Sequence, residues 1–306
     1  MTVTDVSPGH LFCFGLGYSA ERLAAALAAA GWTISGTSRT EDQASVLLGL
    51  GYRMQVFDGS APGGDVAAWL DGVTHVLSSV PAGRGPDGPD GGDPVVAHVS
   101  AALAGCATLQ WLGYLSTTGV YGNTNGAWVD ETAAPSPDVT RSANRVAAEA
   151  AWQALAGDQG LPLHIFRLAG IYGPGRNVLA QVRAGTARRI DKPGHQFSRI
   201  HVDDIARVLR ASMASPNPGA IYNVCDNEPA APADVTAFAC ELLGIALPPL
   251  IAFADAAKEM SPMGLTFWND NRRVRNARIT DELGVDLAYP TYREGLRAIY
   301  DAEFSS

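Results

Sequence analysis

The 306-residue sequence predicts an α/β fold with a doubly wound parallel sheet, and three observations lead to that prediction. Short apolar runs alternate with helix-like segments of roughly 10 to 15 residues. A glycine-rich turn directly follows the first apolar run. The chemically distinctive residues fall at the carboxyl ends of the runs, which is where sheets of this kind bind ligands.

The expected elements follow in a regular order. The expected strands comprise residues 11–14, 32–39, 53–58, 75–80, 110–116, 162–168 and 220–224. The expected helices between them include residues 41–49, 65–70, 95–106 and 203–213. A further helix after the first strand carries Leu23 and Leu27 on one face and ends at Gly31, because glycine is the usual residue just past a helix C-terminus. Right-handed crossovers then place all strands in one parallel sheet.

Two domains are expected, although no clean linker separates them. After Gly170 the alternation gives way to dense glycine, proline and arginine, and the final stretch favours short helices with proline breaks. We expect a dinucleotide-binding domain of residues 1–170 and 196–226. A smaller, mostly helical substrate-binding domain would comprise residues 171–195 and 227–306.

Composition narrows the possible partners. A formal net charge of −9 argues against a nucleic-acid partner, because phosphate binding needs a basic face. No apolar stretch approaches the roughly 20 residues of a membrane span, and the N-terminus lacks the basic start of a signal peptide, so we expect a cytoplasmic protein. The four cysteines and six histidines show no metal-ligand spacing, and no metal is expected. A homodimer is left open.

The segment from Gly15 to Ala20 is a G-x-G-x-x-A fingerprint that follows a strand and opens a helix. In a Rossmann-type domain, Gly15 permits the tight turn, and Gly17 lets the backbone approach a pyrophosphate. The N–H groups of Tyr18 and Ser19 would then contact the phosphates at the helix N-terminus. The sequence therefore predicts a nicotinamide dinucleotide site.

The end of the second expected strand distinguishes the two cofactors. NAD enzymes usually place an acidic residue about 20 residues past the glycines, to bind the ribose 2′-hydroxyl. Ser38 and Arg39 stand there instead, and a hydroxyl beside a guanidinium suits a 2′-phosphate. NADP is therefore expected, with NAD possible, and the alternative is that Arg39 is a solvated loop charge.

Other strand ends supply further candidate cofactor contacts. Asp58 would meet the adenine, and Ser79, Val80 and Pro81 would flank the ribose and the nicotinamide. All four could equally be turn residues.

Several motifs together resemble one family, the extended short-chain dehydrogenases/reductases of the NAD-dependent epimerase/dehydratase type. The resemblance covers nearly the whole chain. It rests on the glycine turn and on residues 115–122 (LSTTGVYG), 166–176 (FRLAGIYGPGR) and 200–206 (IHVDDIA), with 276–279, 282–284 and 289–290 near the end. It implies a substrate such as a nucleotide sugar held against the nicotinamide.

The sequence departs from that family at its catalytic residues. The family uses a Ser or Thr three residues before the valine of the V-Y-G motif, and Thr117 matches it. The family's later Tyr-x-x-x-Lys is replaced, because Arg141 stands at the tyrosine position and Arg145 at the lysine position. An arginine stays protonated and cannot act as a base. The chain therefore resembles atypical members, in which Arg141 would hold an anionic substrate group and Arg145 could instead pair with Glu149.

Another group must then supply the proton. Tyr121 and Tyr172 are the candidates, followed by His201. Alternatively, the two tyrosines pack beneath the crevice with bonded hydroxyls, and His201 caps the helix that follows it. Tyr172, Arg176, His201 and Arg273 are also expected to contact substrate.

Two functions remain open on the sequence alone. The first is an NADP(H)-dependent oxidoreductase or epimerase-like enzyme that acts on a small, polar, anionic substrate. The second is a non-catalytic regulatory protein that senses NADP(H), which the missing Tyr-x-x-x-Lys favours. A scaffold without cofactor is a third reading. A polar pocket at Thr117 and Arg141 would favour the enzyme, because an enzyme must exclude water there.

Overall fold

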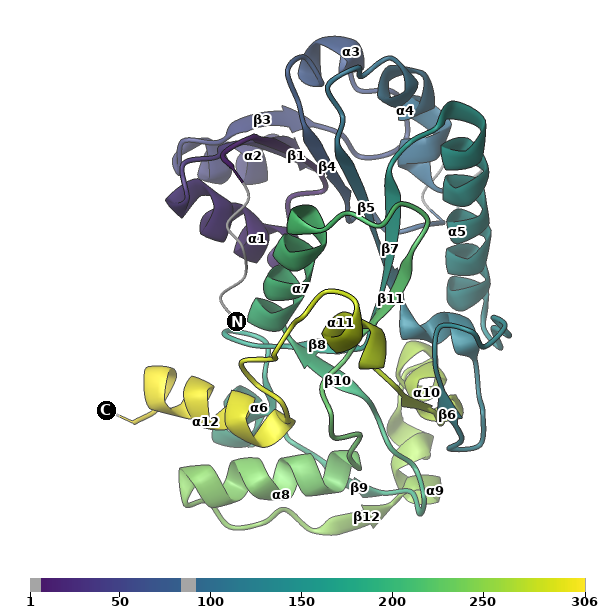
Figure 1. Ribbon diagram of the computed structural model, residues 1–306. Coiled ribbons are helices and arrows are strands. Elements are labelled where there is room, and N and C mark those ends of the chain that lie inside the picture. The colour runs from purple at the N-terminus through teal and green to yellow at the C-terminus, as the bar shows by residue number, and fades with distance from the viewer. Residues whose placement is uncertain (1–6, 84–91, 306) are drawn as a thin grey trace.

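The computed structural model describes residues 7–83 and 92–305, and its centre is one seven-stranded parallel sheet (Figure 1). The strand order is β11-β7-β5-β4-β1-β2-β3. The strands are β1 (His10–Phe14), β2 (Thr33–Ser38), β3 (Arg53–Val56), β4 (His75–Ser78), β5 (Trp111–Thr117), β7 (Leu163–Leu168) and β11 (Ile221–Val224). The predicted α/β fold class is confirmed, and each boundary lies within two residues of its predicted position.

Helices cover both faces of the sheet, which is why most of its strand residues are buried. On one face the core joins Leu23, Leu47 and Leu209, and on the other it joins Val99 and Trp152. The first face carries α1 (Tyr18–Ala29), α2 (Glu41–Leu48) and α7 (Val202–Ala214). The second carries α3 (Val66–Trp69), α4 (Pro94–Ala104) and α5 (Thr140–Gln159). All six residues of β7 are buried as a result.

A second group of elements, here called the C-terminal lobe, lies below the sheet in Figure 1. Its helices are α6 (Val178–Arg183), α8 (Pro232–Leu243), α9 (Phe253–Ala256), α10 (Pro262–Asn269) and α12 (Tyr292–Glu303). It also contains two parallel strand pairs, β8 (Gly170–Tyr172) with β10 (Arg199–His201) and β9 (Arg189–Asp191) with β12 (Leu250–Ala252). These short strands were not expected from the sequence, because runs of three residues carry too little periodicity to be recognised.

The lobe has a hydrophobic cluster of its own, in which Leu179, Phe238 and Leu296 join α6, α8 and α12. This separate cluster supports the expected two-domain division, which stays a prediction. The remaining elements are short. They are the pair β6 (Trp128–Val129) and β13 (Arg273–Val274), α11 (Ala277–Asp281) and two 3-10 turns, Thr118–Tyr121 and Ala257–Glu259.

Two searches of the described ranges gave negative results. None of their helices combines the length and hydropathy that a membrane span requires. Their His, Cys, Asp and Glu side chains nowhere gather in a group of three or more that could hold a metal ion.

Candidate functional site

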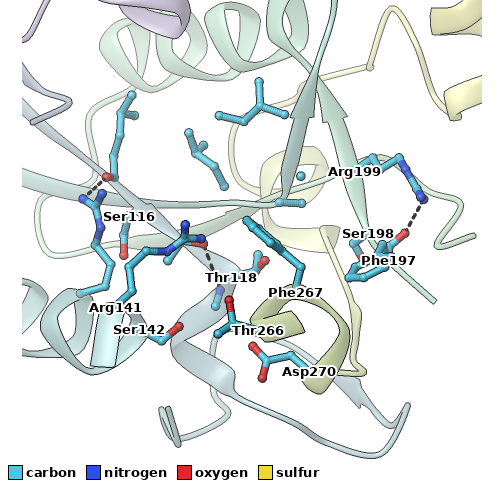
Figure 2. A pocket seen from close by; sticks show the side chains of 18 of the residues that line it. Ser116, Thr118, Arg141, Ser142, Phe197, Ser198, Arg199, Thr266, Phe267 and Asp270 are labelled. Atoms are coloured by element: carbon cyan, nitrogen blue, oxygen red, sulfur yellow. Dashed lines mark hydrogen bonds between the residues drawn. The ribbon is translucent and has the colours of Figure 1, made fainter. Parts of the chain in front are cut away.

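A cavity of about 1180 Å³ opens where the carboxyl ends of β1, β4, β5 and β7 face the C-terminal lobe. Its walls come from the turn after β1, the ends of β4 and β5, the start of α5, and lobe residues 196–199, 266–268, 270, 272 and 274. Figure 2 shows side chains of α5, β5 and α10 pointing toward one another across it. The carboxyl ends of a doubly wound sheet are where ligands bind, so the cavity is the candidate site.

The fingerprint turn has the geometry that a dinucleotide needs. Gly15 has φ +79°, a backbone conformation that favours glycine, and its N–H donates to the Thr37 hydroxyl at 2.9 Å. Gly17 precedes α1 without a side-chain cap, and a Cβ added there would meet nothing within 4 Å. The N–H groups of the first turn are therefore open to an anion.

Tyr18 and Ser19 line the cavity from this turn. The Tyr18 hydroxyl donates to the Pro174 carbonyl at 2.9 Å and so ties the turn to the lobe. Arg176 lies over the Tyr18 ring, 6.0 Å from its centroid, and is an exposed residue of the cavity wall. The sequence placed Arg176 among the substrate contacts, and the structure brings it to the cavity.

Ser38, Arg39 and Asp58 lie outside the cavity, at the ends of β2 and β3. The buried Ser38 hydroxyl donates to the Thr40 carbonyl at 2.8 Å, whereas Arg39 is exposed. Asp58 is exposed and accepts from the hydroxyl and the N–H of Ser60, and these bonds lower the pKa of its carboxyl group. Their roles toward a cofactor stay predictions.

The end of β4 closes over the fingerprint turn. The Ser79 hydroxyl donates to the Gly15 carbonyl, and Val80 packs where a Gly15 side chain would stand. Ser79 and the exposed Pro81 line the cavity, whereas Val80 is buried beside them.

Thr117 lines the cavity at the end of β5. Its hydroxyl accepts from the N–H of Gly119 at 3.1 Å. A Cβ added to Gly119 would stand 3.0 Å from the Ser142 hydroxyl and 3.3 Å from the Thr117 hydroxyl. Gly119 therefore keeps the space between two hydroxyl groups of the cavity wall open.

Arg141 reaches into the cavity from the first turn of α5, and Figure 2 shows it pointing toward Phe267 of α10. Its guanidinium carbon lies 5.0 Å from the centroid of that ring. Arg141 is exposed, and no side chain caps the N-terminus of α5. A cation at the open N-terminus of a 20-residue helix makes this wall attractive to an anion.

Arg145 also borders the cavity, one turn further along α5. Its Nη1 donates to the Tyr114 hydroxyl at 2.9 Å and to the Leu115 carbonyl at 3.0 Å. These bonds hold the guanidinium against β5. The alternative ion pair between Arg145 and Glu149 does not form, because Glu149 is engaged by Arg167.

Tyr121 is not a group that faces substrate, which corrects the expectation that it supplies a proton. Only 2% of it is exposed, and it is absent from the cavity wall. Its hydroxyl donates to Asn223 at 2.8 Å and accepts from Arg167 at 2.9 Å. Burial raises the pKa of Tyr121. It packs beneath the crevice, as the alternative interpretation held.

His201 likewise lies away from the cavity wall and caps α7. Its Nδ1 accepts from the N–H of Asp203 at 3.2 Å, and its ring lies 4.0 Å from that of Tyr289. Burial lowers the pKa of His201 to about 4, so the ring is neutral at pH 7. This corrects the expectation of a substrate contact.

Tyr172 does line the cavity, although 8% of it is exposed and its hydroxyl has no hydrogen-bond partner within the described ranges. Burial raises its pKa, so its hydroxyl is a weaker acid than that of an ordinary tyrosine and a poor proton donor.

Arg273 points away from the cavity, and its neighbour Arg272 lines the wall instead. The Nε of Arg273 donates to the Gly126 carbonyl at 2.6 Å, and its guanidinium lies over Trp128. Successive side chains of an extended segment point to opposite sides, so a choice between neighbours depends on the register of β13 with β6. The expected substrate contact of Arg273 is therefore wrong.

Several wall residues were not predicted from the sequence, namely Ser142, Ser198, Arg199, Phe267 and Asp270. The Nη1 of Arg199 donates to the carbonyls of Phe197 and Ala230 at 2.9 and 3.0 Å. The arginine-rich stretch 272–275 was the one signal available for the C-terminal part. Among the described residues of the wall, the charged side chains are five arginines and Asp270.

Comparison with known proteins identifies relatives along nearly the whole chain. Residues 96–225 match the family model described as NAD dependent epimerase/dehydratase family. Protein YeeZ of Escherichia coli is 29% identical over 287 residues, which cover 90% of this chain and 94% of YeeZ.

Solved structures of similar fold also cover nearly the whole chain. A functionally unknown conserved protein from Silicibacter pomeroyi is 51% identical with a TM-score of 0.85, covering 96% of this chain and 99% of that one. UDP-glucuronic acid 4-epimerase from Bacillus cereus, in complex with NAD, is 17% identical with a TM-score of 0.77, covering 95% and 97% of the two chains. At that identity the second likeness concerns the fold alone.

Proposed function

We propose that the chain is an NADP(H)-dependent oxidoreductase or epimerase-like enzyme of the NAD-dependent epimerase/dehydratase family, whose model matches residues 96–225. Its substrate would be small and anionic, and related to a nucleotide sugar. One observation carries the proposal. A single cavity brings Thr117 and Arg141 together with the fingerprint turn, and a protein that only senses a dinucleotide has no need of such a space.

The residues at the end of β1 fit a dinucleotide pyrophosphate. The open N–H groups of the first turn of α1 would hold it, and the unfilled space at Gly17 would allow its close approach. Ser38 and Arg39 would hold a 2′-phosphate, because no carboxylate stands at the end of β2 to repel it. When bound, the nicotinamide supplies or accepts a hydride. The UDP-glucuronic acid 4-epimerase of similar fold was solved in complex with NAD. The proposal of NADP for this chain therefore rests on Ser38 and Arg39 and not on that structure.

The basic wall supports an anionic substrate. Arg141 stands at the N-terminus of α5, and Arg176, Arg199 and Arg272 line the same space. In a chain of net charge −9, four arginines that reach one cavity in addition to Arg145 indicate selection for a negative group. Arg141 would bind it and, being always protonated, would not transfer a proton.

Thr117 would hydrogen-bond the oxygen at the reacting carbon. Its hydroxyl already accepts from Gly119, so its own hydrogen is available to a ligand in the cavity. The Ser142 hydroxyl, across Gly119 from Thr117, is a further group that could relay a proton to or from solvent.

A non-catalytic NADP(H) sensor is the second candidate function. One observation favours it, since Arg145, which the family resemblance puts at the position of the catalytic Lys, is held by the Tyr114 hydroxyl and the Leu115 carbonyl. A cytoplasmic location and a homodimer also stay predictions.

Calorimetric titration with NADPH, NADP⁺, NADH and NAD⁺ tests the cofactor. We expect the phosphorylated forms to bind more tightly, and NADPH to bind more tightly than NADP⁺, because Arg141 disfavours a positively charged ring. The R141A variant should lose the second preference. The control variant R188A removes an arginine that pairs with Glu259 outside the cavity, and it should leave the preference for NADPH over NADP⁺ unchanged. Absence of binding by all four dinucleotides would contradict the proposal.

A hydride-exchange assay separates the enzyme from the sensor. NADPH carrying deuterium at C4 is incubated with the protein and a pool of polar metabolites, and the metabolites are searched for deuterium by mass spectrometry. An enzyme transfers the label and its T117A variant does not. A sensor that binds NADPH and never transfers the label would replace the first proposal.

A further inference from the structure

Arg176 lies where the C-terminal lobe meets the fingerprint turn. It belongs to the segment between β8 and α6, and it lines the cavity together with Gly17, Tyr18 and Ser19. Its guanidinium carbon lies 6.0 Å from the centroid of the Tyr18 ring, and the residue is exposed. The lobe therefore brings a cation to the turn at which the proposed cofactor would place its pyrophosphate.

A closed turn fixes the backbone that carries Arg176. The N–H of Gly173 donates to the Arg176 carbonyl at 3.0 Å, and the N–H of Arg176 donates to the Gly173 carbonyl at 3.0 Å. The Asn177 amide donates to that same Gly173 carbonyl at 3.1 Å, while its Oδ1 accepts from the N–H of Ala180 and caps α6. The backbone at Arg176 therefore needs no reordering when its side chain binds a ligand.

Tyr18 connects this turn to α1. Its hydroxyl donates to the Pro174 carbonyl at 2.9 Å. A Cβ added to Gly173 would stand 2.7 Å from the Tyr18 hydroxyl and 2.7 Å from Cγ1 of Val202. A side chain at position 173 would therefore displace Tyr18, and glycine lets the first residue of α1 reach the turn that carries Arg176.

The fingerprint turn by itself carries too little positive charge for a pyrophosphate. The pyrophosphate of a dinucleotide bears two negative charges, whereas the N-terminus of a helix acts as about half a positive charge. The first turn of α1 contains the acidic Glu21, and Arg22 is paired with Asp203 at 3.5 Å. A cation from another part of the cavity wall would therefore strengthen the binding of a pyrophosphate at this turn.

The other arginines in the described part of the cavity wall serve other places. Arg145, Arg199 and Arg272 donate hydrogen bonds to protein groups. Arg141 stands at the start of α5, which packs against β5 and the turn after it. Because β4 lies between β5 and β1, that end of the cavity is about 10 Å from the turn after β1. Arg176 is thus the wall arginine that is placed for the pyrophosphate.

We propose that Arg176 is a cofactor-binding residue contributed by the C-terminal lobe, and that it binds the dinucleotide pyrophosphate together with the fingerprint turn. The inference rests on the proposed function, which supplies the dinucleotide. It assigns to the cofactor a residue that the sequence placed among the substrate contacts, and it leaves Arg141, Arg199 and Arg272 as the wall toward an anionic substrate. The bound dinucleotide then links the lobe to α1, in addition to the bond between Tyr18 and Pro174.

Calorimetric titration of the full chain with NADPH, NADP⁺, NADH and NAD⁺ tests this assignment, because all four share the pyrophosphate. We expect R176A to weaken each dinucleotide that the wild type binds by about tenfold, the effect of one lost charge-assisted bond at an exposed position. The affinity ratios between phosphorylated and unphosphorylated forms, and between reduced and oxidised forms, should stay as in the wild type. R39A and R141A, by contrast, should each change one of these ratios.

The matched control is R183A. Arg183 is also an exposed arginine of the lobe that lies over an aromatic ring, 5.4 Å from the centroid of Phe304, and it is outside the cavity wall. R183A should keep the affinity of the wild type for every dinucleotide. R176E should weaken binding about tenfold beyond R176A, because a carboxylate repels the pyrophosphate, whereas loss of packing against Tyr18 alone would affect both variants equally.

The outcomes separate this inference from the proposed function. Unchanged affinity in R176A overturns the role of Arg176, and so do equal losses in R176A and R176E. A loss confined to the phosphorylated forms, or to one redox state, also overturns it, because the 2′-phosphate or the nicotinamide would then be the partner. Each of these results leaves the proposed function standing. If the wild type binds none of the four dinucleotides, the proposed function and this inference are both contradicted.

Discussion

Replacing Glu149 by Gln should test how far a buried ion pair beneath the cavity stabilises the fold. Glu149 and Arg167 each expose 4% of their side chain, and they meet through bonds of 2.7, 3.1 and 3.3 Å. The Ser116 hydroxyl donates to Glu149 at 2.5 Å, and Arg167 continues to Tyr121. The pair thus joins α5 to β5 and β7 directly below the cavity.

The expected cost follows from what the variant leaves behind. Glutamine keeps the size of the side chain and can still accept from Ser116, but the guanidinium of Arg167 remains charged in a site that excludes water. Removing one partner of a buried ion pair costs about 3–5 kcal/mol. We expect the lower end, about 3 kcal/mol of unfolding free energy, because Arg167 keeps its bond to Tyr121 and its stacking on that ring.

Urea denaturation followed by far-UV circular dichroism measures this difference. The matched control is E282Q, which removes the partner of Arg278 in an i,i+4 pair of the same 2.7 Å length with 41% and 32% exposed side chains. Such surface pairs contribute about 0–1 kcal/mol. The double variant E149M/R167M should be less destabilised than E149Q, since it leaves no unpaired charge.

Equal destabilisation by E149Q and E282Q would refute the reasoning, because Glu149 belongs to a buried pair with bonds to Ser116 and Tyr121, whereas Glu282 belongs to an exposed pair. A double variant that is less stable than E149Q would also refute it. In that case the pair itself, and not the unpaired charge, would carry the energy.

Three further predictions concern the cofactor, the cavity and a buried histidine. R39A should weaken NADPH binding by about tenfold, the effect of about 1.4 kcal/mol from a lost charge-assisted bond, as measured by calorimetry. T117A should lower turnover by about 10²-fold in the hydride-exchange assay, because it removes an oriented donor from the reacting oxygen. H201N should reduce the loss of stability between pH 7 and pH 5 by about 2 kcal/mol in urea denaturation, because asparagine also caps helices and does not titrate.

The sign of the last effect follows from the pKa of His201, which burial lowers to about 4 from 6.5. The unfolded chain therefore binds a proton more readily than the folded one, and stability falls as pH drops through the window from 6.5 to 4. Parallel pH profiles of H201N and the wild type would contradict the assignment. An R39A variant that loses as much affinity for NADH as for NADPH would contradict the role of Arg39. Full activity in T117A, alongside unchanged activity in T117S, would contradict the role of Thr117.

Much of the fold was predictable because local patterns specify it. A short apolar run such as Leu11–Phe14, followed directly by a glycine turn, indicates a strand buried on both faces, and a chain of such runs linked by helices forms one parallel sheet. The turn at Gly15 was predictable for the same reason, because its positive φ leaves glycine as the unstrained residue.

The individual roles of wall residues were less predictable. Tyr121 belongs to a motif at a strand end, but the direction of its side chain is set by hydrogen bonds with Arg167 and Asn223. These residues lie 46 and 102 residues further along the chain. Arg272 and Arg273 are neighbours, and only the pairing of β13 with β6 decides which one reaches the cavity.

The sequence by itself determined the strands of the sheet and the fingerprint turn, because each depends on residues close together in the chain. The tertiary structure alone decided that Asp270 and Arg141 share one cavity with Thr117. The physical reason is that their proximity comes from the packing of the C-terminal lobe against the ends of β5 and α5. That packing is the sum of many distant contacts, and no local pattern of residues records it.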